Sequence, residues 1–368
     1  MNNPTCDICG GKTKKNGHTS SGKVRYRCTV CGASSIKKND SSAKALQSFL
    51  KWLLSKNSIA ELGISRASFW RHFARFWEIW PIAPYTGEVH DVVFLDGIWI
   101  GGVVVLIASA KKHVLTWHLA RSESSQSWAT LMQKIPEPVC AVSDGSSGFA
   151  KAARAIWPNT RIQRCTFHVF ESIKRCTTTR PNLDCGKEIY ALAKSLMKVA
   201  DTDLAAAWIA DFASWCSRWD TFLKEYTLVD GKRQYTHERL RKARRILDRL
   251  LKEGTLFTYI SLQEELGGVW PAMNNEIEGG VNAQIRKVLR SHSGMPKMHC
   301  IKAAFWWCYM HTEAPLSPAE ILKVMPTDDD IDGLFANTET IDKEDRRPTE
   351  RGLGIDWNEF HMPTEFRQ

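Results

Sequence analysis

Three consecutive apolar segments are the feature that most constrains how this chain can fold. They are DVVFLDGIWI (residues 91–100), GGVVVLIASA (101–110) and HVLTWHLA (113–120), and each has the length and composition of a buried strand. The glycines at 101–102 and the residues at 110–112 predict short turns between them. The chain is therefore predicted to contain three meandering strands that follow one another directly.

Helical and apolar segments then alternate in a regular way. SSQSWATLMQKI (124–135), SSGFAKAARAIW (146–157) and HVFESIKR (168–175) predict helices, and VCAVSDG (139–145) and RIQRCTF (161–167) predict the strands between them. Three meandering strands followed by this alternation match the order of a ribonuclease H-like α/β core. In that architecture the first and fourth strands lie side by side.

Acidic residues end two of the apolar runs. Asp96 ends DVVFLDG and Asp144 ends VCAVSDG, while a third acid, Glu278, lies where NNEIEGGVNAQIRKVLR begins a predicted helix. Unpaired carboxylates are costly near a core, and a divalent cation relieves their repulsion. Carboxylate oxygens suit Mg²⁺, and two such ions can hold the attacking and leaving oxygens of a phosphodiester. A single Asp at a strand end is more often a turn or a helix cap, so the interpretation depends on all three acids.

Two close cysteine pairs stand near the beginning of the chain. Cys6 and Cys9 are separated from Cys28 and Cys31 by the eighteen residues 10–27. Two Cys-x-x-Cys pairs at this separation predict a tetrahedral zinc site in a ribbon over residues 1–38, with KKNGHTSSGKVRYRC as its hairpin. A segment this short cannot bury a core, so bound zinc would supply its folding free energy.

The net charge of +10 favours a polyanionic partner, most commonly nucleic acid. The ribbon has no acid between residues 12 and 38. Its basic residues are candidates for phosphate contacts, although a solvated basic face is the alternative. These candidates are Lys14, Lys15, Lys23, Arg25 and Arg27.

Residues 41–80 have the outline of a helix-turn-helix domain. SAKALQSFLKWLLSK predicts one helix, SIAELGIS a short second one, and RASFWRHFARFW a basic helix that follows Gly63 and begins after Ser65 as its N-cap. The basic helix, with Arg66 and Arg71, would enter a major groove. A plain helical hairpin is the alternative.

The remaining segments complete the predicted domain order. The α/β core occupies residues 88–182 and 269–314, an all-α insertion residues 183–268, and a loosely ordered tail with one short helix residues 315–368. The start, MNNPTCDIC, lacks the apolar stretch of a signal peptide, and no window is long enough to span a membrane. Reduced thiols are expected, in the cytoplasm or nucleoid of a bacterium or in a nucleus.

Four motifs in this order resemble the mutator-type (MULE-like) DDE transposases of bacterial insertion sequences, in the branch with an N-terminal zinc ribbon. The motifs are FLDG around Asp96, VSDG around Asp144, QRCTFH with Cys165 and His168, and NNEIEGGVNAQIR with Glu278. The family pattern Asn-x-Ile-Glu selects Glu278 over its neighbour Glu276. Glu171 and Ser172 depart from the family, which usually has a basic residue and an amide there.

The resemblance implies a DDE transposase with two Mg²⁺ (or Mn²⁺) ions held by Asp96, Asp144 and Glu278. Such an enzyme cleaves DNA at the element's ends, and the freed 3′-hydroxyl attacks target DNA. The implied partners are double-stranded DNA, as terminal inverted repeats and as target, and further copies of the chain in a homodimer or higher oligomer.

The other candidate site residues have open roles. His168 either contacts the scissile region or caps its helix, and Cys165 either joins the active site or packs in the core. The Cys-x-x-His pair could bind zinc, but the sequence offers no second pair near it. Arg286 and Arg290 either hold phosphates or form a solvated face.

Two other functions are compatible with the same segments. One is a DNA-binding regulator derived from a transposase, with an inactive core. The other is a cellular nuclease with a ribonuclease H-like core. Mg²⁺-dependent strand cleavage separates the first from a transposase, and strand transfer of a pre-cleaved 3′ end separates the second.

Overall fold

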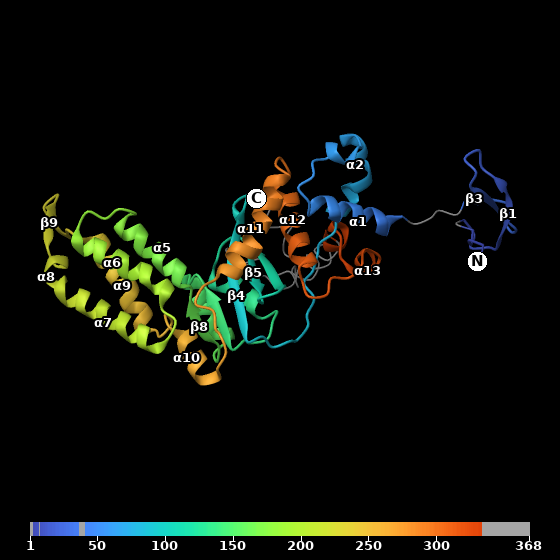
Figure 1. Ribbon diagram of the computed structural model, residues 1–368. Helices are drawn as coiled ribbons and strands as arrows, with labels where there is room; N and C mark the ends of the chain where they lie inside the picture. Colours follow the sequence, from blue (N-terminus) through green and yellow to red (C-terminus); the bar gives the residue numbers. More distant parts are fainter. Residues whose placement is uncertain (1–2, 7, 37–40, 333–368) are drawn as a thin grey trace, which may run out of the picture.

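The computed structural model describes residues 3–6, 8–36 and 41–332, with a five-stranded sheet at its centre (Figure 1). Its strands are β4 (Val92–Ile100), β5 (Val103–Ser109), β6 (Val114–Ala120), β7 (Cys140–Ser143) and β8 (Arg161–Arg164). The spatial order is β6-β5-β4-β7-β8, in which β4, β5 and β6 are antiparallel and β7 and β8 run parallel to β4. The predicted α/β class, the three-strand meander and the pairing of the first strand with the fourth are confirmed.

Helices cover both faces of this sheet because alternate residues of its strands are apolar on both sides. In β5, Val104 and Leu106 pack beneath one helix pair, whereas Val105 and Ile107 pack beneath the other. The first pair is α3 (Ser125–Met132) and α4 (Ser147–Ile156), and the second is α11 (Ala283–Ser291) and α12 (Lys297–Met310). α12 is buried on all sides, since the N-terminal helices cover its outer face.

A helical lobe projects from the β8 edge of the sheet (Figure 1). Its helices are α5 (Thr166–Thr177), α6 (Asp184–Ser195), η3 (Leu196–Lys198), α7 (Thr202–Arg218), α8 (Asp220–Leu223) and α9 (Glu238–Lys252), and α10 (Thr258–Leu266) leads back to β8. The lobe has its own core, in which Ile173 of α5 packs with Ile189, Trp215 and Leu247. The first helix after the sheet is therefore part of the lobe's core.

A β-hairpin interrupts this lobe, so the prediction that residues 183–268 are all-α is wrong at one point. β9 (Tyr226–Val229) pairs antiparallel with β10 (Lys232–Tyr235). The two turn residues, Asp230 and Gly231, have φ of 51° and 72°. Asp-Gly is a preferred sequence for a two-residue hairpin turn that needs positive φ at both positions. The dipeptide is the local signal that identifies the hairpin.

The N-terminal helices follow the predicted order. They are α1 (Ser42–Leu53), η1 (Ala60–Leu62), α2 (Arg66–Phe73) and η2 (Ala74–Trp77). Gly63, with φ of 67°, ends η1, and the Ser65 hydroxyl accepts a hydrogen bond from the Ser68 N–H at 3.1 Å, which caps α2. Phe49 and Phe69 pack in the same core as α12, so these helices are fixed to the α/β core.

Residues 315–332 are packed against the rest of the molecule, which corrects the prediction of a loosely ordered tail for this part. α13 (Pro318–Val324) contacts α1, and the Trp80 N–H donates to the Pro326 carbonyl at 2.9 Å. Ile331 is fully buried. The predicted tail beyond this point, 333–368, lies outside the described residues. Among the described residues, no helix is both long and apolar enough to cross a membrane.

Lys302 of α12 attaches this C-terminal segment to the core. Its side chain is 1% exposed, and its Nζ donates to Asp328 Oδ1 and to the Trp77 carbonyl, each at 2.6 Å. The Trp80 indole N–H also donates to Asp328 Oδ1, at 2.7 Å. Burial lowers the pKa of Lys302, and Asp328 opposes that shift. Asp328 is therefore the counterion of a buried cation.

We expect Asp328→Ala to lower the free energy of unfolding by about 3 kcal/mol, because it leaves the Lys302 charge buried without a counterion. The midpoint of urea unfolding, followed by tryptophan fluorescence, measures this effect. Asp329→Ala is the matched control: this neighbour is exposed, and its change should stay within about 0.5 kcal/mol. Equal midpoints for the two variants would contradict the counterion role.

Candidate active site

Asp96 and Asp144 come together where β7 ends. Leu95 of β4 pairs with Ser143, the last residue of β7, so the next residues, Asp96 and Asp144, follow side by side. Asp96 lies inside β4, because β4 continues to pair with β5 as far as Ile100. The parallel pairing of β4 with β7 ends at Leu95 and Ser143. Beyond these residues β7 no longer covers the side of β4 that lies next to both aspartates.

Glu278 lies on a π-helical turn, η4 (Glu276–Asn282), which packs against β4. Ile277 and Val281 are buried. They turn Glu278 inward, with its side chain 25% exposed, and leave Glu276 exposed. π-helical turns are rare and frequently occur at functional sites.

Asn282, at the end of η4, contacts Asp96 directly and was not predicted from the sequence. Its Nδ2 donates to Asp96 Oδ2 at 2.8 Å, while the Gly97 N–H donates to the other carboxylate oxygen, Oδ1, at 2.9 Å. Asn282 follows Glu278 by four residues, and this helical spacing is the signal that could have placed both on one face. The two contacts fix the orientation of the Asp96 carboxylate.

A fourth carboxylate, Glu123, was also missed. It lies between β6 and α3, and its Oε1 accepts a hydrogen bond from the Trp99 indole at 3.2 Å. A Cβ added to Gly97 would lie 3.0 Å from Glu123 Oε1, so the glycine of the FLDG motif leaves room for this side chain beside Asp96. An acid shortly after an apolar strand is the same pattern that identified Asp144.

Asp96, Glu123 and Glu278 have raised pKa values. Burial raises the pKa of Asp96 to about 7, against the hydrogen bond from Gly97, and the charges of Asp144, Glu278 and Glu123 raise it further. Burial and the charge of Asp144 also raise the pKa values of Glu123 and Glu278. Such a concentration of acids in a half-buried site is costly without a compensating cation.

Arg164, at the end of β8, provides a buried positive charge next to Asp144. Burial lowers the pKa of this guanidinium and Asp144 opposes that shift. Its Nη1 is buried without a hydrogen-bond partner among the described residues. Gly145 has φ of 76°, and a Cβ there would overlap the guanidinium. The VSDG motif therefore requires glycine both for the turn and for the approach of Arg164.

Cys165 and His168 stand next to Glu278. Cys165 is fully buried between β8 and α5, and its Sγ accepts a hydrogen bond from the Asn274 N–H at 3.2 Å. The His168 Nδ1 lies 3.1 Å from Glu278 Oε1. Burial raises the pKa of the Cys165 thiol, and the N–H groups of His168, Asn274 and Phe167 oppose that shift. Both residues of the QRCTFH motif thus lie at the acidic cluster.

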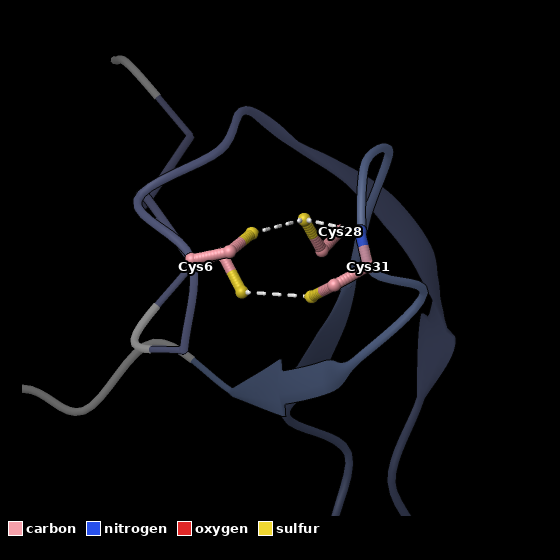
Figure 2. A group of neighbouring side chains, drawn as sticks. Cys6, Cys28 and Cys31 are labelled. Atoms are coloured by element: carbon pink, nitrogen blue, oxygen red, sulfur yellow. Dashed lines mark hydrogen bonds between the residues drawn. The ribbon is translucent and has the colours of Figure 1, made fainter.

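The four cysteines of the N-terminal segment also converge. Cys28 is the last residue of β2 in a separate sheet of β1 (Thr13–His18), β2 (Val24–Cys28) and β3 (Ser34–Ile36), and the other three cysteines lie in the turns beside it. The sulfurs of Cys6 and Cys31 are 3.5 Å apart (Figure 2). The sulfurs of Cys9 and Cys28 are also 3.5 Å apart. Around one zinc ion with bonds of about 2.3 Å, tetrahedral sulfurs lie about 3.8 Å apart. This set could hold a metal ion with little rearrangement.

All the basic residues proposed as DNA contacts have exposed side chains. On the small sheet, Lys14 is paired with Arg27, and Arg25 lies on the same side of β2 as Arg27, away from the buried Tyr26. The exposed residues are Lys14, Lys15, Lys23, Arg25, Arg27, Arg66, Arg71, Arg286 and Arg290. The charge of Arg286 also opposes the rise in the pKa of Glu278, so it lies close to the acidic cluster.

Comparison with known proteins finds similarity to one family of transposases. Residues 102–236 match the model of the transposases of the Mutator family. The chain is related to the mutator-type transposases. The matched segment includes Asp144, Cys165 and His168, and Asp96 and Glu278 lie on either side of it. The resemblance inferred from the motifs is confirmed.

Three proteins with similar sequences are named as transposases, or a probable transposase, of insertion sequences. The transposase of IS6120 from Mycolicibacterium smegmatis is 38% identical over 66 residues, 17% of this chain and 20% of that protein. The transposase of ISRM3 from Rhizobium meliloti is 23% identical over 161 residues, 40% of each protein. A probable transposase from Corynebacterium diphtheriae is 22% identical over 163 residues, 37% of this chain and 48% of that protein. The chain thus spans between a fifth and about half of the length of these relatives.

Proposed function

We propose that this chain is a DDE transposase of a bacterial insertion sequence, which cleaves DNA at the element's ends and joins the 3′ ends to target DNA. The proposal is supported by the neighbouring positions of Asp96 and Asp144 on β4 and after β7, and by the packing of the turn that carries Glu278 against β4. The sheet order, with its antiparallel meander and two parallel strands, supports a ribonuclease H-like core.

The residues present fit a pair of Mg²⁺ ions, since several carboxylates with raised pKa values face one another. When bound, the ions supply a polarised phosphodiester and an activated water. Asp96 is held for this role by Asn282 and Gly97. Glu123 extends the acidic cluster on the Trp99 side, and the Arg164 guanidinium balances part of the charge near Asp144.

DNA recognition belongs, in this proposal, to the small cysteine-containing sheet and to α2. The sheet is a zinc ribbon held by Cys6, Cys9, Cys28 and Cys31, with a basic face that includes Lys14 and Arg27. α2 is the second helix of a helix-turn-helix, whose inner face packs through Phe69 and Phe73 while Arg66 and Arg71 remain exposed. Two element ends require at least two copies of the chain, which acts on the bacterial nucleoid.

The double variant Lys14→Ala/Arg27→Ala tests the basic face of the ribbon. We expect weaker binding to the element ends and a smaller dependence of the binding constant on salt, by about 0.9 in the log–log slope for each phosphate that the variant no longer neutralises. Fluorescence anisotropy at several salt concentrations measures the slope. Lys111→Ala/Lys112→Ala removes the same charge from an exposed turn of the large sheet and should leave the slope unchanged. Equal slopes for the two double variants would exclude the ribbon from phosphate binding.

A two-part assay tests the function itself. The substrate is a labelled duplex that carries the DNA flanking the reading frame, incubated with the full chain and MgCl₂. Mg²⁺-dependent cleavage at a defined position excludes an inactive DNA-binding regulator. Transfer of a pre-cleaved 3′ end into a second duplex excludes a cellular nuclease. Cleavage without transfer, at any position, would contradict the proposal.

A further inference from the structure

Cys165, His168 and Glu278 form a second group of converging ligand atoms, distinct in chemistry from the all-carboxylate cluster. One ligand atom from each of the three residues lies within 4.8 Å of the other two. Cys165 precedes α5, His168 lies in its first turn, and Glu278 approaches from η4, 110 residues further along the chain. The fold therefore adds to the Cys-x-x-His pair a third ligand that the sequence alone did not offer.

We propose that these three residues bind a zinc-class cation at a site separate from the four cysteines of the ribbon, and that this ion competes with the acidic cluster for Glu278. The first part depends only on the three side chains. The second part rests on the proposed function, because it assumes that Glu278 serves the catalytic ions.

Two orphaned polar atoms point to a cation at this position. His168 Nδ1 and Glu278 Oε1 are 3.1 Å apart, which is an ion-pair distance when the imidazole is protonated, but the two atoms form no hydrogen bond. Each atom is buried and has no hydrogen-bond partner among the described residues. Buried polar groups without a partner are rare, and each requires an explanation such as a bound ion. A cation between the two atoms satisfies both lone pairs at once.

The surroundings of Cys165 suit a metal-bound thiolate. Its side chain is fully buried, and its sulfur accepts the Asn274 N–H at 3.2 Å from the side of η4. It also precedes the first turn of α5, where backbone N–H groups favour a negative charge. Hydrogen bonds of this kind orient a ligand and stabilise its charged form. Binding of the ion displaces the thiol proton to solvent.

The donor set selects zinc over magnesium. Thiolate and imidazole are soft or intermediate ligands that suit Zn²⁺, whereas Mg²⁺ prefers oxygen ligands alone. Three protein ligands of mixed type leave one tetrahedral position for water, as in zinc sites that remain open to solvent. The His168 and Glu278 side chains are each 25% exposed, so the three ligands lie close to the protein surface.

Glu278 cannot serve both sites at once. In the described conformation its Oε1 points to His168, while Asn282 from the same turn holds Asp96. A zinc ion on Cys165 and His168 therefore stabilises the conformation in which Glu278 is turned away from the aspartates. We expect micromolar Zn²⁺ to inhibit DNA cleavage supported by millimolar Mg²⁺.

The zinc content of the purified full chain, measured by mass spectrometry of the metal, tests the site. We expect two zinc ions per wild-type chain, and one fewer in Cys165→Ser, His168→Asn and Glu278→Gln. Cys140→Ser is the matched control, since this cysteine is equally buried on β7 but belongs to neither cysteine-containing group, and it should retain both ions. Cobalt substitution should give a thiolate charge-transfer absorption that decreases in the same three variants.

The outcomes separate this site from the ribbon and from the proposed function. Cys28→Ser should also lose one ion, and Cys28→Ser/Cys165→Ser should lose two. Asp96→Asn should keep both ions whether or not the chain is a transposase, because metal content does not depend on cleavage. If Cys165→Ser does not fold, as judged by circular dichroism, His168→Asn decides alone, because its side chain is partly exposed. The same zinc content in wild type and in folded His168→Asn would overturn the proposal.

Discussion

Asp96→Ala and Asp144→Ala are expected to abolish DNA cleavage and strand transfer while binding to the element ends is retained. Each substitution removes one carboxylate from a cluster in which Asp96 already has its pKa raised by burial and by neighbouring acids. Removal of a single preorganised hydrogen-bond donor commonly costs about 10²–10³-fold in rate, and removal of a metal ligand should cost at least as much. Single-turnover cleavage of a labelled end, with gel-shift binding in parallel, measures both effects.

Asp91→Ala is the matched control for these two variants. Asp91 is exposed and immediately precedes β4, so its substitution changes the charge by the same amount near the same strand without touching the cluster. Its cleavage rate should equal that of the wild type. Wild-type rates in Asp96→Ala or Asp144→Ala would exclude these carboxylates from catalysis. Loss of DNA binding together with cleavage would indicate unfolding instead.

The parts of the fold that the sequence predicts are those encoded by local patterns. The strands β4, β5 and β6 have apolar residues on both faces and glycine-containing or short turns, so their order follows from a contiguous stretch of chain. The end of β7 beside Asp144 is equally local. Pairing of the first and fourth strands then brings Asp96 and Asp144 together, without any information from distant segments.

The parts that escaped prediction depend on contacts between distant segments. The contact between His168 and Glu278 joins residues 110 positions apart, with the helical lobe between them. The packing of residues 315–332 depends on Lys302, a charged residue that is buried only because Asp328 and Trp77 are brought to it. The residues that form these long-range contacts do not belong to a periodic apolar pattern. The composition of residues 315–332 therefore predicted a solvated segment.

Asn282 and Glu123 are a different case, because their signals were present. Asn282 follows Glu278 at helical spacing, and Glu123 follows a buried strand as Asp144 does. What the sequence did not reveal was the π-helical geometry of η4, which decides how both Glu278 and Asn282 face β4. Local spacing could therefore identify the candidates, whereas their orientation needed the structure.

Glu278→Gln should eliminate detectable cleavage, and Glu276→Gln should leave it nearly unchanged. Both substitutions keep the shape of the side chain and remove one negative charge from the same helical turn. Glu278 is turned inward, with its side chain 25% exposed and its Oε1 near His168, whereas Glu276 is exposed. Removal of the charge at Glu276, near the helix start, should cost about 0.5 kcal/mol of stability. Cleavage rates and thermal unfolding of the two variants measure these effects.

The two variants can be compared directly because Glu276 and Glu278 are only two positions apart. Ile277, between them, is fully buried. Burial of Ile277 and Val281 fixes the rotation of η4, so the two carboxylates cannot exchange places without unpacking the core. If Glu276→Gln abolished cleavage and Glu278→Gln retained it, the third ligand would be Glu276, and the rotation of η4 in the active complex would differ from the one described. In that case the double variant Glu276→Gln/Ile277→Ala should remain inactive in DNA cleavage, because the group that it lacks is the carboxylate itself.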